Sequence, residues 1–600
     1  MSAAQIITFI VLGLAILVFL SDRLRPDLIA LLIALSLGLS GVLTPEETFS
    51  GFSRSAVITI LAISILAEGL QRAGVTEQAG NLLARLAGKG EARMIGVVML
   101  VGAVLSLFMN NISAASVLLP AVSGAARKTG VSPSRLLMPL AFGTLLGGMA
   151  TLLTTTNIVV SNLLRERGLP GFGLLDFAPL GGVLILAGVL YMLLVGRRWL
   201  PKRQPAYGQA NGMVQEELFD TYRLGERLIC GRIRQDSPLA GATLLESRLR
   251  EQYDLNLLAI RHGGRTLASL SPDTRLQPGD VLLLESPQNI QPQALDPLMQ
   301  LLSPGGWDEA DLETSGAVLV EAVLAPRSGL IGRTLREAHF RAKYGVNVVG
   351  IWRAGRPLTA QLSELKLYFG DALLLQGLPE KLNLLRSEPD LLMLTDGAGK
   401  LQRVTGKGWL ALGILLVALV LALPNPDLTG LVMLGGGLAM VLTRVLSMDQ
   451  AYRAVEWKTI FLVVGVLPLG IALGKTGAAA MIGAQVLDWL SPLGPLGLLA
   501  GLFLAGVLLT QVMHGAAVAI ILAPVAIDIA AQTGLDARAL AMGVALATSM
   551  AFITPLGHPV NILVMTPGGY RFRDFLRLGL PLVLLLFVLI MLLLPVFWPL

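Results

Sequence analysis

The sequence predicts a polytopic α-helical membrane protein, built from two inverted repeats and interrupted by a soluble α+β insert. The first observation is composition: the 600 residues are 54% hydrophobic and 14% charged, with a mean hydropathy of +0.70. Soluble proteins carry roughly 25% charged residues, so this chain belongs in a bilayer. The second is an internal match between the two ends of the chain. The third is a change to charged, proline-punctuated sequence between about 203 and 402.

The internal match has a constant displacement of 404 positions and needs no gap. Alanine-rich apolar sequence matches by chance, but proline, Thr-Gly and asparagine matches at one displacement indicate a duplication. The matching pairs are Leu118 and Leu522, Pro120 and Pro524, Thr129-Gly130 and Thr533-Gly534, Met138 and Met542, Thr144 and Thr548, and Asn157 and Asn561.

Apolar runs recur in the same order in both halves, and most are long enough to approach the roughly 20 residues of a membrane span. We expect five full crossings and one re-entrant hairpin in each half, because the fourth run is split by a polar island. An odd number of crossings inverts the second half relative to the first. The runs are 4–20, 27–43, 55–71, 94–109 with 112–126, 136–163 and 177–196, then 408–423, 428–445, 458–474, 494–511 with 514–531, 538–566 and 577–598.

Lys and Arg gather at alternate connections, which predicts ten spans with both termini outside and the insert in the cytoplasm. We place the protein in the inner (plasma) membrane. The run from Ile6 to Leu20 lacks a small-residue cleavage site, so we expect a retained span rather than a signal peptide. The expected inside residues include Arg23, Arg25, Lys89, Arg93, Arg135, Arg203, Arg403, Lys407, Arg453 and Arg573, against Arg54, Arg165, Arg167, Lys475 and Arg538 outside.

The insert is itself duplicated, at a displacement of 91 positions. Each copy is expected to start with a G-x-T-L turn and to end with a Gly-Asp turn before an apolar strand such as Val281–Glu285. The expected divisions of the chain are 1–202 and 403–600 for the membrane repeats, and 203–310 and 311–402 for the two soluble domains. The matching pairs are Gly241 and Gly332, Thr243 and Thr334, Asn256 and Asn347, Arg265 and Arg356, and Gly279-Asp280 and Gly370-Asp371.

Polar islands inside the apolar runs are the candidate functional residues. Asn110 and Asn111 lie at the tip of the first hairpin, and unpaired amides in hydrocarbon cost several kcal/mol. They therefore line a cavity, or they join helices by hydrogen bonds. His514-Gly515 occupies the equivalent place in the second repeat. His514 there is a proton-coupling group, a substrate ligand or a residue whose hydrogen bonds are all made at the hairpin tip.

Helix breaks follow both islands. The first break is expected at Gly147-Gly148 and Thr154–Asn157, the second over Thr554–Asn561, with His558 inside it. The hydroxyl groups at these breaks either bind a ligand or donate hydrogen bonds to backbone carbonyls of their own helix. Helix N-termini at breaks attract anions, and unwound carbonyls ligate cations such as Na⁺.

Several classes of protein are excluded by the sequence. A single cysteine, Cys230, excludes an internal disulfide framework, and the four histidines form no HExxH. No GxGxxG opens a helix after a strand and no Walker lysine motif is present, so we expect no organic cofactor and no enzyme. The net charge of +6 lies mostly at the ends of apolar runs, which indicates a bilayer rather than nucleic acid as partner.

The motifs resemble the divalent anion:sodium symporter family, which contains sulfate and di- or tricarboxylate carriers. The insert resembles tandem TrkA-C domains, the C-terminal domains of regulators of K⁺ conductance (RCK), as in the sulfur-acclimation-like sulfate permease branch. The motifs that carry the resemblance are Phe108–Ile112, Leu118–Pro120, Ser132–Pro139, Gly147-Gly148, Thr155–Asn157, Thr554–Gly557, Asn561 and Pro567–Phe575.

This resemblance implies a homodimeric elevator whose hairpin tips and helix breaks bind substrate and sodium. The tips depart from the family's Ser-Asn-Thr motif, most of all at His514-Gly515, where side-chain oxygens are missing. The implied substrate ligands are Asn110, Asn111, Ser113, Thr156, Asn157, His514, Gly515 and Asn561. The implied sodium ligands are Asn111, Ser113, Thr155, Thr554 and Gly557.

We therefore expect an elevator-type symporter for a small divalent anion, with sulfate ahead of dicarboxylates, driven by Na⁺ or else by H⁺. The soluble domains would regulate transport through an unknown small ligand or hold the dimer. The alternatives are a cation or arsenite antiporter, an RCK-gated cation channel and a membrane receptor. Against a Na⁺/H⁺ antiporter, no intramembrane carboxylate is expected apart from Glu68, which we pair with Arg72.

Overall fold

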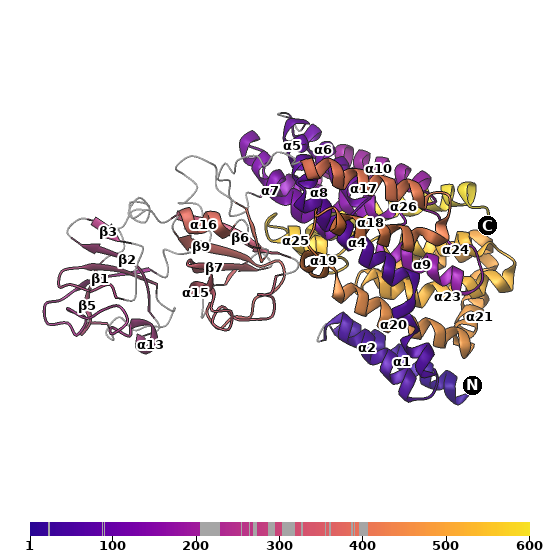
Figure 1. Ribbon diagram of the computed structural model, residues 1–600, viewed down its shortest axis with the longest axis horizontal. Helices are drawn as coiled ribbons and strands as arrows, with labels where there is room; N and C mark the ends of the chain where they lie inside the picture. Colours follow the sequence, from indigo (N-terminus) through magenta and orange to yellow (C-terminus); the bar gives the residue numbers. More distant parts are fainter. Residues whose placement is uncertain are drawn as a thin grey trace.

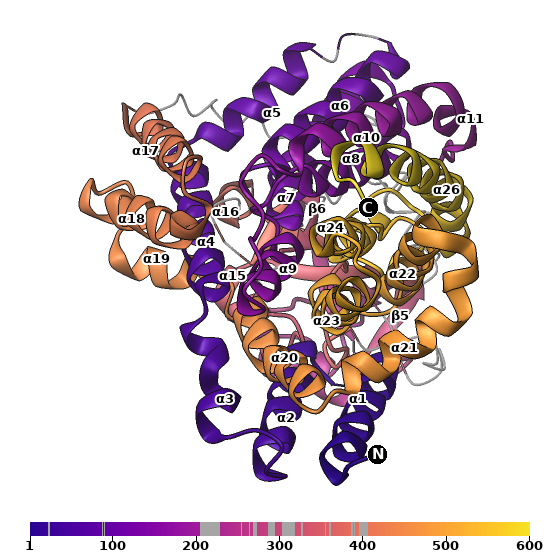
Figure 2. The same cartoon turned by 90° about the vertical axis from the view of Figure 1, so that its right-hand side faces the viewer.

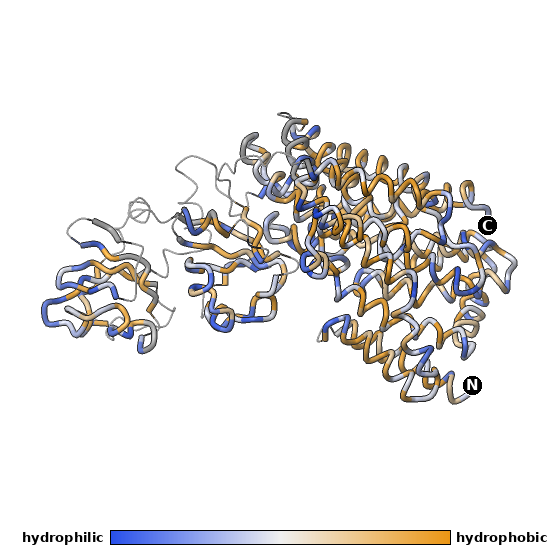
Figure 3. The backbone as a smooth tube through the Cα atoms, in the orientation of Figure 1, coloured by the Kyte–Doolittle hydropathy of each residue, from blue (hydrophilic) through white to orange (hydrophobic). Residues whose placement is uncertain are grey.

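The computed structural model divides into a large helical body and an insert of two small sheets (Figure 1). Both chain termini lie at the end of the helical body away from the insert. Colouring by hydropathy separates the two parts, because the helical body is mostly apolar and the insert carries more hydrophilic segments (Figure 3). The described residues are 1–21, 24–86, 88, 90–203, 228–253, 255–262, 265–267, 273–285, 295–302, 318–325, 328–353, 356–358, 362–377, 379–385, 388, 390–394 and 406–600.

The first half of the helical body contains eleven α-helices and three short turns of other helix types within its described residues. They are α1 (Ala3–Ser21), α2 (Pro26–Leu39), α3 (Pro45–Phe49), η1 (Ser50–Ser53), α4 (Ser55–Arg72), α5 (Val75–Leu86), α6 (Glu91–Ser106), α7 (Asn111–Thr129), η2 (Pro133–Arg135), α8 (Leu137–Met149), α9 (Thr155–Glu166), α10 (Ala178–Tyr191), η3 (Met192–Gly196) and α11 (Arg197–Trp199).

The second half follows the same order, and each of its α-helices has a counterpart in the first. α7 and α23 both have 19 residues and begin 404 positions apart, and so do the starts of α9 and α25. These coincidences support the duplication. The elements are α17 (Gly406–Ala422), η7 (Pro426–Leu428), α18 (Thr429–Leu442), α19 (Met448–Ala454), α20 (Trp457–Lys475), α21 (Ala478–Leu490), η8 (Ser491–Leu493), α22 (Gly494–Thr510), α23 (Gly515–Thr533), α24 (Ala537–Ala547), α25 (Pro559–Met565) and α26 (Phe572–Phe597).

Six helical stretches of the described chain are long and apolar enough to cross a membrane by length and composition. The expected ten crossings stay a prediction, because several apolar helices have only 10–17 residues. The counterparts α5 and α21 lie at opposite ends of the helical body, with α5 near the insert (Figure 1). The six stretches are Pro45–Arg72, Ala178–Trp199, Trp457–Lys475, Ala478–Thr510, Gly515–Thr533 and Phe572–Phe597.

Most helices form two packed groups, which we call the hairpin bundle (α6–α10 and α22–α26) and the flanking helices (α1–α4 and α17–α20), while α5 and α21 pack mainly against α7 and α23 of the bundle. Figure 2 shows α17–α19 and α1–α3 around the bundle. Glycines permit the closest crossings within each group. A Cβ on Gly147 of α8 would lie 2.2 Å from the Ala103 carbonyl oxygen of α6. A Cβ on Gly465 of α20 would lie 2.4 Å from the Ala30 carbonyl carbon of α2. Contacts between the groups include α20 with α23 and α4 with α9.

The two helix breaks differ slightly from the sequence expectation. α8 continues through Gly147-Gly148 to Met149, because these glycines serve close packing rather than ending the helix, and the chain unwinds at 150–154. The second break begins earlier than expected, directly after Ala547, and ends at His558.

The described residues of the insert form two five-stranded antiparallel sheets of identical topology, ordered β3-β2-β4-β1-β5 and β8-β7-β9-β6-β10. The same bulge recurs 91 positions apart, at Leu257/Ala259 and Val348/Gly350, which supports the second duplication. The elements are β1 (Leu228–Ile233), α13 (Leu249–Tyr253), β2 (Asn256–His262), β3 (Arg265–Leu267), β4 (Val281–Glu285), β5 (Met299–Leu302), β6 (Val318–Leu324), α15 (Phe340–Tyr344), β7 (Asn347–Arg353), β8 (Arg356–Leu358), β9 (Ala372–Gly377), α16 (Pro379–Leu385) and β10 (Leu391–Met393).

The second sheet contacts the hairpin bundle. β10 lies against α7, and Ala372 and Leu394 belong to the apolar core of the helical body. The turn before β9 approaches α25, since a Cβ on Gly370 would lie 3.1 Å from the Ile562 carbonyl oxygen. The expected domain boundaries at 310/311 and 402/403, and the residues Arg23, Lys89 and Arg403, lie outside the described residues.

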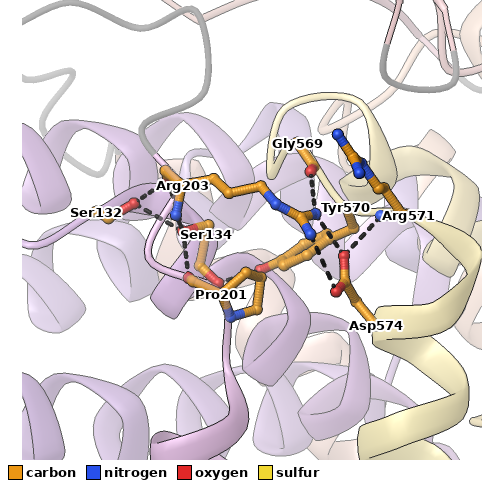
Figure 4. Close-up of polar contacts among 8 residues, drawn as sticks. All are labelled: Ser132, Ser134, Pro201, Arg203, Gly569, Tyr570, Arg571 and Asp574. Carbon is orange, nitrogen blue, oxygen red and sulfur yellow. Dashed lines mark hydrogen bonds and ion pairs between the residues drawn. The ribbon is translucent and has the colours of Figure 1, made fainter.

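The segment that leads toward the insert is held on the hairpin bundle by a polar cluster (Figure 4). The Arg203 guanidinium donates to Asp574 Oδ2 at 2.6 Å and to the Gly569 carbonyl at 2.9 Å. The Ser134 hydroxyl bonds to the Pro201 and Arg203 backbone. The fully buried Tyr570 hydroxyl donates to the Ser134 carbonyl and accepts from the Met138 N–H. The cluster therefore ties both repeats to residue 203.

Candidate functional site

A cavity of about 120 Å³, lined by both polar and apolar side chains, lies where the two hairpin tips and the two helix breaks meet. The first residues of α7, α9 and α23 line it, together with residues of α4 and of the segment before α20. Its lining consists of Ile60, Ile63, Ser64, Ala67, Met109, Asn110, Asn111, Ile112, Ser113, Leu145, Leu153, Thr154, Thr155, Thr156, Glu456, Thr459, His514, Gly515, Thr548, Ser549 and His558.

Hydrogen bonds hold both amides of the first hairpin tip, two of their partners being local in sequence and one, Glu456, distant. Asn110 Oδ1 accepts from the Ile112 N–H at 2.9 Å and so caps the start of α7. Its Nδ2 donates to the Glu456 carboxylate, at 3.0 and 3.3 Å. Asn111 Oδ1 accepts from the Ser106 hydroxyl. A Cβ on Gly148 would lie 2.6 Å from this same Oδ1, so α8 supports the Asn111 carboxamide from behind.

The first break is closed by side-chain hydrogen bonds to its own backbone. The Thr154 hydroxyl donates to the Gly148 carbonyl, and Asn157 Nδ2 donates to the Thr151 carbonyl at 2.7 Å. Two buried oxygens, Thr156 Oγ1 and Asn157 Oδ1, have no hydrogen-bond partner among the described residues. Buried polar atoms are nearly always paired, so these two oxygens are open to a ligand.

The second hairpin tip is built from His514 and Gly515. His514 Nδ1 accepts from the Ala516 N–H at 3.3 Å, which caps α23. A Cβ on Gly515 would lie 2.5 Å from the Thr548 carbonyl oxygen and 3.1 Å from Thr156 Cγ2. Glycine at this position therefore brings the second tip into contact with both helix breaks.

The second break is braced by Gln511, Thr554 and Asn561. The Thr554 hydroxyl donates to the Gln511 carbonyl and accepts from the Gly557 N–H, at 2.9 and 3.0 Å. Asn561 Nδ2 donates to the Ala551 and Thr554 carbonyls, at 2.6 and 3.1 Å. Asn561 Oδ1 is buried and has no partner among the described residues, like the oxygen of Asn157.

The sequence-predicted residues separate into two groups. Those that line the cavity are Asn110, Asn111, Ser113, Thr155, Thr156, His514 and Gly515. Asn157, Thr554, Gly557 and Asn561 are absent from the described lining and stabilise the breaks beneath it.

Glu68 pairs with Arg72 at 2.7 Å, as expected. A carboxylate that the sequence did not single out, that of Glu456, lies in the cavity wall. Its position next to Arg453 and Lys458 is typical of a membrane flank, so the sequence offers no local signal for a site role. Thr459, Thr548, Ser549 and Ser64 are also lining residues that sequence reasoning missed.

Apart from Glu456 and two histidines, the described lining is uncharged. Amide, hydroxyl and backbone N–H donors at helix N-termini suit an anion that must be bound and then released. A multi-pass helical body with such a cavity at broken helices defines a membrane transporter.

The comparisons with known proteins identify the family. The chain belongs to the CitMHS family, described as "Citrate transporter", whose model matches residues 16–547 and 495–599. Family and relatives are transporters and not enzymes.

Three relatives illustrate the similarity. "Uncharacterized transporter YfbS" of Escherichia coli is 33% identical over 98% of both chains. "Uncharacterized transporter sll0640" of Synechocystis is 32% identical, over 97% of this chain and 95% of the relative. "Sodium/sulfate cotransporter 1" of Chlamydomonas reinhardtii is 27% identical, over 61% of this chain and 43% of the relative.

Proposed function

We propose that this chain is a secondary active transporter that imports a small divalent anion, sulfate ahead of di- or tricarboxylates, together with sodium. The observation that carries the proposal is the convergence of three helix N-termini, those of α7, α9 and α23, on one cavity of uncharged donors. The positive ends of helix dipoles and their unpaired N–H groups favour an oxyanion there.

The size of the cavity is sufficient for sulfate. A cavity of about 150 Å³ takes up one benzene molecule. The cavity here has a volume of about 120 Å³, and sulfate is smaller than benzene.

Sodium coupling is supported by oxygens that lack partners. Thr156 Oγ1, Asn157 Oδ1 and Asn561 Oδ1 are buried acceptors, and hard cations such as Na⁺ prefer oxygen ligands. The names of relatives such as "Sodium/sulfate cotransporter 1" agree with a sodium ion as co-substrate. We assign Asn111, Ser113, Thr155, Thr554 and Gly557 to the sodium sites. We add the open oxygens of Thr156, Asn157 and Asn561, which the resemblance assigns to the substrate.

The transport cycle that we propose moves the hairpin bundle against the flanking helices of a homodimer, as in an elevator. The protein would lie in the inner membrane with the insert in the cytoplasm, as two RCK C-terminal-like domains. The contact of the second sheet with α7 and α25 gives this insert a route to the moving bundle. Binding of a small ligand to the insert would then regulate transport.

The test is uptake of labelled sulfate, succinate and citrate into proteoliposomes, with and without an inward sodium gradient. Asn111→Ala should abolish uptake, while Asn425→Ala, at an exposed loop position, is the matched control. Sodium-dependent accumulation of sulfate supports the proposal. Uptake that follows a proton gradient would transfer the coupling role to His514, and no anion uptake under either gradient would overturn the proposal.

A further inference from the structure

Glu456 brings a carboxylate into a cavity that is otherwise suited to an anion. It immediately precedes α20 and belongs to the flanking helices, whereas the neutral donors belong mainly to the hairpin bundle. Its oxygens accept from Asn110 Nδ2, at 3.0 and 3.3 Å, and from the Thr459 hydroxyl at 3.2 Å. Among the described lining residues it is the one carboxylate.

The carboxylate occupies a donor that a substrate oxyanion would use. Asn110 caps α7 through its Oδ1, so its Nδ2 is directed away from the helix and toward Glu456. A divalent anion that bound to the same amide would lie beside the carboxylate and would meet a charge of its own sign. Like charges placed together in a desolvated site are strongly unfavourable.

The two partners of this contact sit in different packed groups. Asn110 precedes α7, in the hairpin bundle, while α20 is packed closely on α2 through Gly465. The two groups also meet at the other end of α20. Gly474 there lies so close to Arg167, just after α9, that a Cβ on Gly474 would be 2.6 Å from Arg167 Nη2. Arg54 and Glu166 form an ion pair between the groups at 3.2 Å. A displacement of the bundle along α20 would separate Asn110 from Glu456.

We propose that Glu456 is a tethered competitor of the substrate, which replaces the anion on Asn110 when the hairpin bundle occupies the position seen here. This inference rests on the proposed function. The carboxylate keeps the Asn110 amide hydrogen-bonded after the substrate leaves, so release does not strand a buried donor. Because Glu456 stays with the flanking helices, the competition acts on one side of the membrane. Glu456 lies between Arg453 and Lys458, which the positive-inside rule assigns to the cytoplasmic side, where we also expect the insert. The site then binds the anion more weakly on this insert side than on the opposite side.

The test compares sulfate half-saturation on the two faces, using right-side-out and inside-out vesicles that contain the full chain. Glu456→Gln removes the charge and keeps a side-chain oxygen that can accept from the Thr459 hydroxyl in the first turn of α20. We expect half-saturation on the insert face to fall at least about tenfold, with the opposite face changed less than about twofold. Net uptake should slow, because release becomes limiting.

Two further variants keep the test decisive. Asp449→Asn, at an exposed position in the first turn of α19, removes a nearby carboxylate and should change neither value. Glu456→Ala removes both charge and acceptor and should also strengthen binding on the insert face; it replaces Glu456→Gln if that variant does not fold.

The outcomes separate the inference from the proposed function. Wild-type sulfate transport with equal half-saturation in Glu456→Gln overturns the tethered competitor alone, and so does a change of equal size on both faces. A wild-type chain that transports none of the tested anions overturns the proposed function and this inference together.

Discussion

Asn157 and Asn561 occupy equivalent positions, 404 residues apart, and make the same unusual arrangement. Each donates its Nδ2 to a backbone carbonyl of the preceding break, and each leaves a fully buried Oδ1 without a partner among the described residues. Both repeats therefore contain an asparagine whose Nδ2 is hydrogen-bonded and whose Oδ1 is not. Hydrogen bonds that stabilise the break thus hold each carboxamide in place and leave its oxygen without a partner of its own.

The first prediction concerns these two oxygens. Asn157→Ala and Asn561→Ala should each raise the sodium concentration for half-maximal sulfate uptake by about tenfold, equivalent to roughly 1.4 kcal/mol. The reason is the loss of an oxygen ligand together with the brace that holds the break. The measurement is a sodium activation curve in proteoliposomes.

The control for this prediction is Asn162→Ala. Asn162 lies on the same helix, but its Nδ2 donates to the Ile158 carbonyl one turn away. Its loss should leave the sodium curve unchanged. An equal shift in Asn162→Ala would show that helix stability, and not the Asn157 oxygen, sets the sodium dependence.

The second prediction concerns the support of Asn111 by α8. Gly148→Ala would place a Cβ 2.6 Å from Asn111 Oδ1, which must then move. Uptake should fall at least about tenfold, because small misplacements of a positioned group cost large factors in rate. Gly182→Ala, on α10 where a Cβ would meet nothing within 4 Å, is the control for uptake and for melting temperature. Unchanged uptake in Gly148→Ala would argue that Asn111 does not contact the substrate.

The sequence predicts the hairpin tips well, because polar islands within apolar runs have few structural uses. α7 begins at Asn111 and α23 at Gly515, as the 404-residue displacement implies. The sequence does not predict how far each helix continues. Gly147 suggests a helix break, but α8 continues through it because the glycine permits close contact with Ala103. Nor does it predict the contact of Glu456 with Asn110, which spans 346 positions and is created by packing of the two helix groups.

The third prediction tests the junction at Arg203 (Figure 4). Ser134→Ala removes a hydroxyl that bonds the Pro201 and Arg203 carbonyls at 2.7 Å and the Arg203 N–H at 3.1 Å. The Arg203 carbonyl keeps its bond from the Ser132 hydroxyl, and each hydrogen bond lost at the other two groups costs about 0.5–1.5 kcal/mol. Amide exchange at residues 199–203 should accelerate accordingly, as measured by hydrogen exchange and mass spectrometry. Ser36→Ala, an exposed serine that bonds its own helix, is the control, and equal acceleration in both variants would contradict the assignment.

The fourth prediction concerns pH and the second sheet domain. Asp390 accepts from the Tyr344 hydroxyl at 2.7 Å, from Lys343 Nζ at 3.1 Å and from the Gly329 N–H at 2.7 Å. Burial acts to raise the pKa of Asp390, but these three donors outweigh it and hold the pKa below its usual value. Burial also raises the pKa of Tyr344 to about 12, so neither Tyr344 nor Lys343 changes charge near neutral pH.

A carboxyl whose pKa is lower in the folded state stabilises the fold above its unfolded pKa, which is about 3.9 for Asp. That contribution is lost as the pH falls through the lower, folded value. We therefore expect the stabilising contribution of Asp390 to stay constant between pH 5 and 8, and the stability of this domain to fall below about pH 4. The measurement is hydrogen exchange in β6 and β10 of the full chain, corrected for the intrinsic effect of pH on exchange.

Asp390→Asn should lower the stability of the domain by about 2 kcal/mol at neutral pH, because charge-assisted hydrogen bonds are lost. It should also flatten the decline below pH 4, since the variant has no carboxyl to protonate there. Glu364→Gln is the control, because the Glu364 carboxylate is 48% exposed and pairs only across the surface with Arg336. A wild-type domain whose exchange in β10 is equally protected at pH 3 and pH 7 would contradict the role of Asp390.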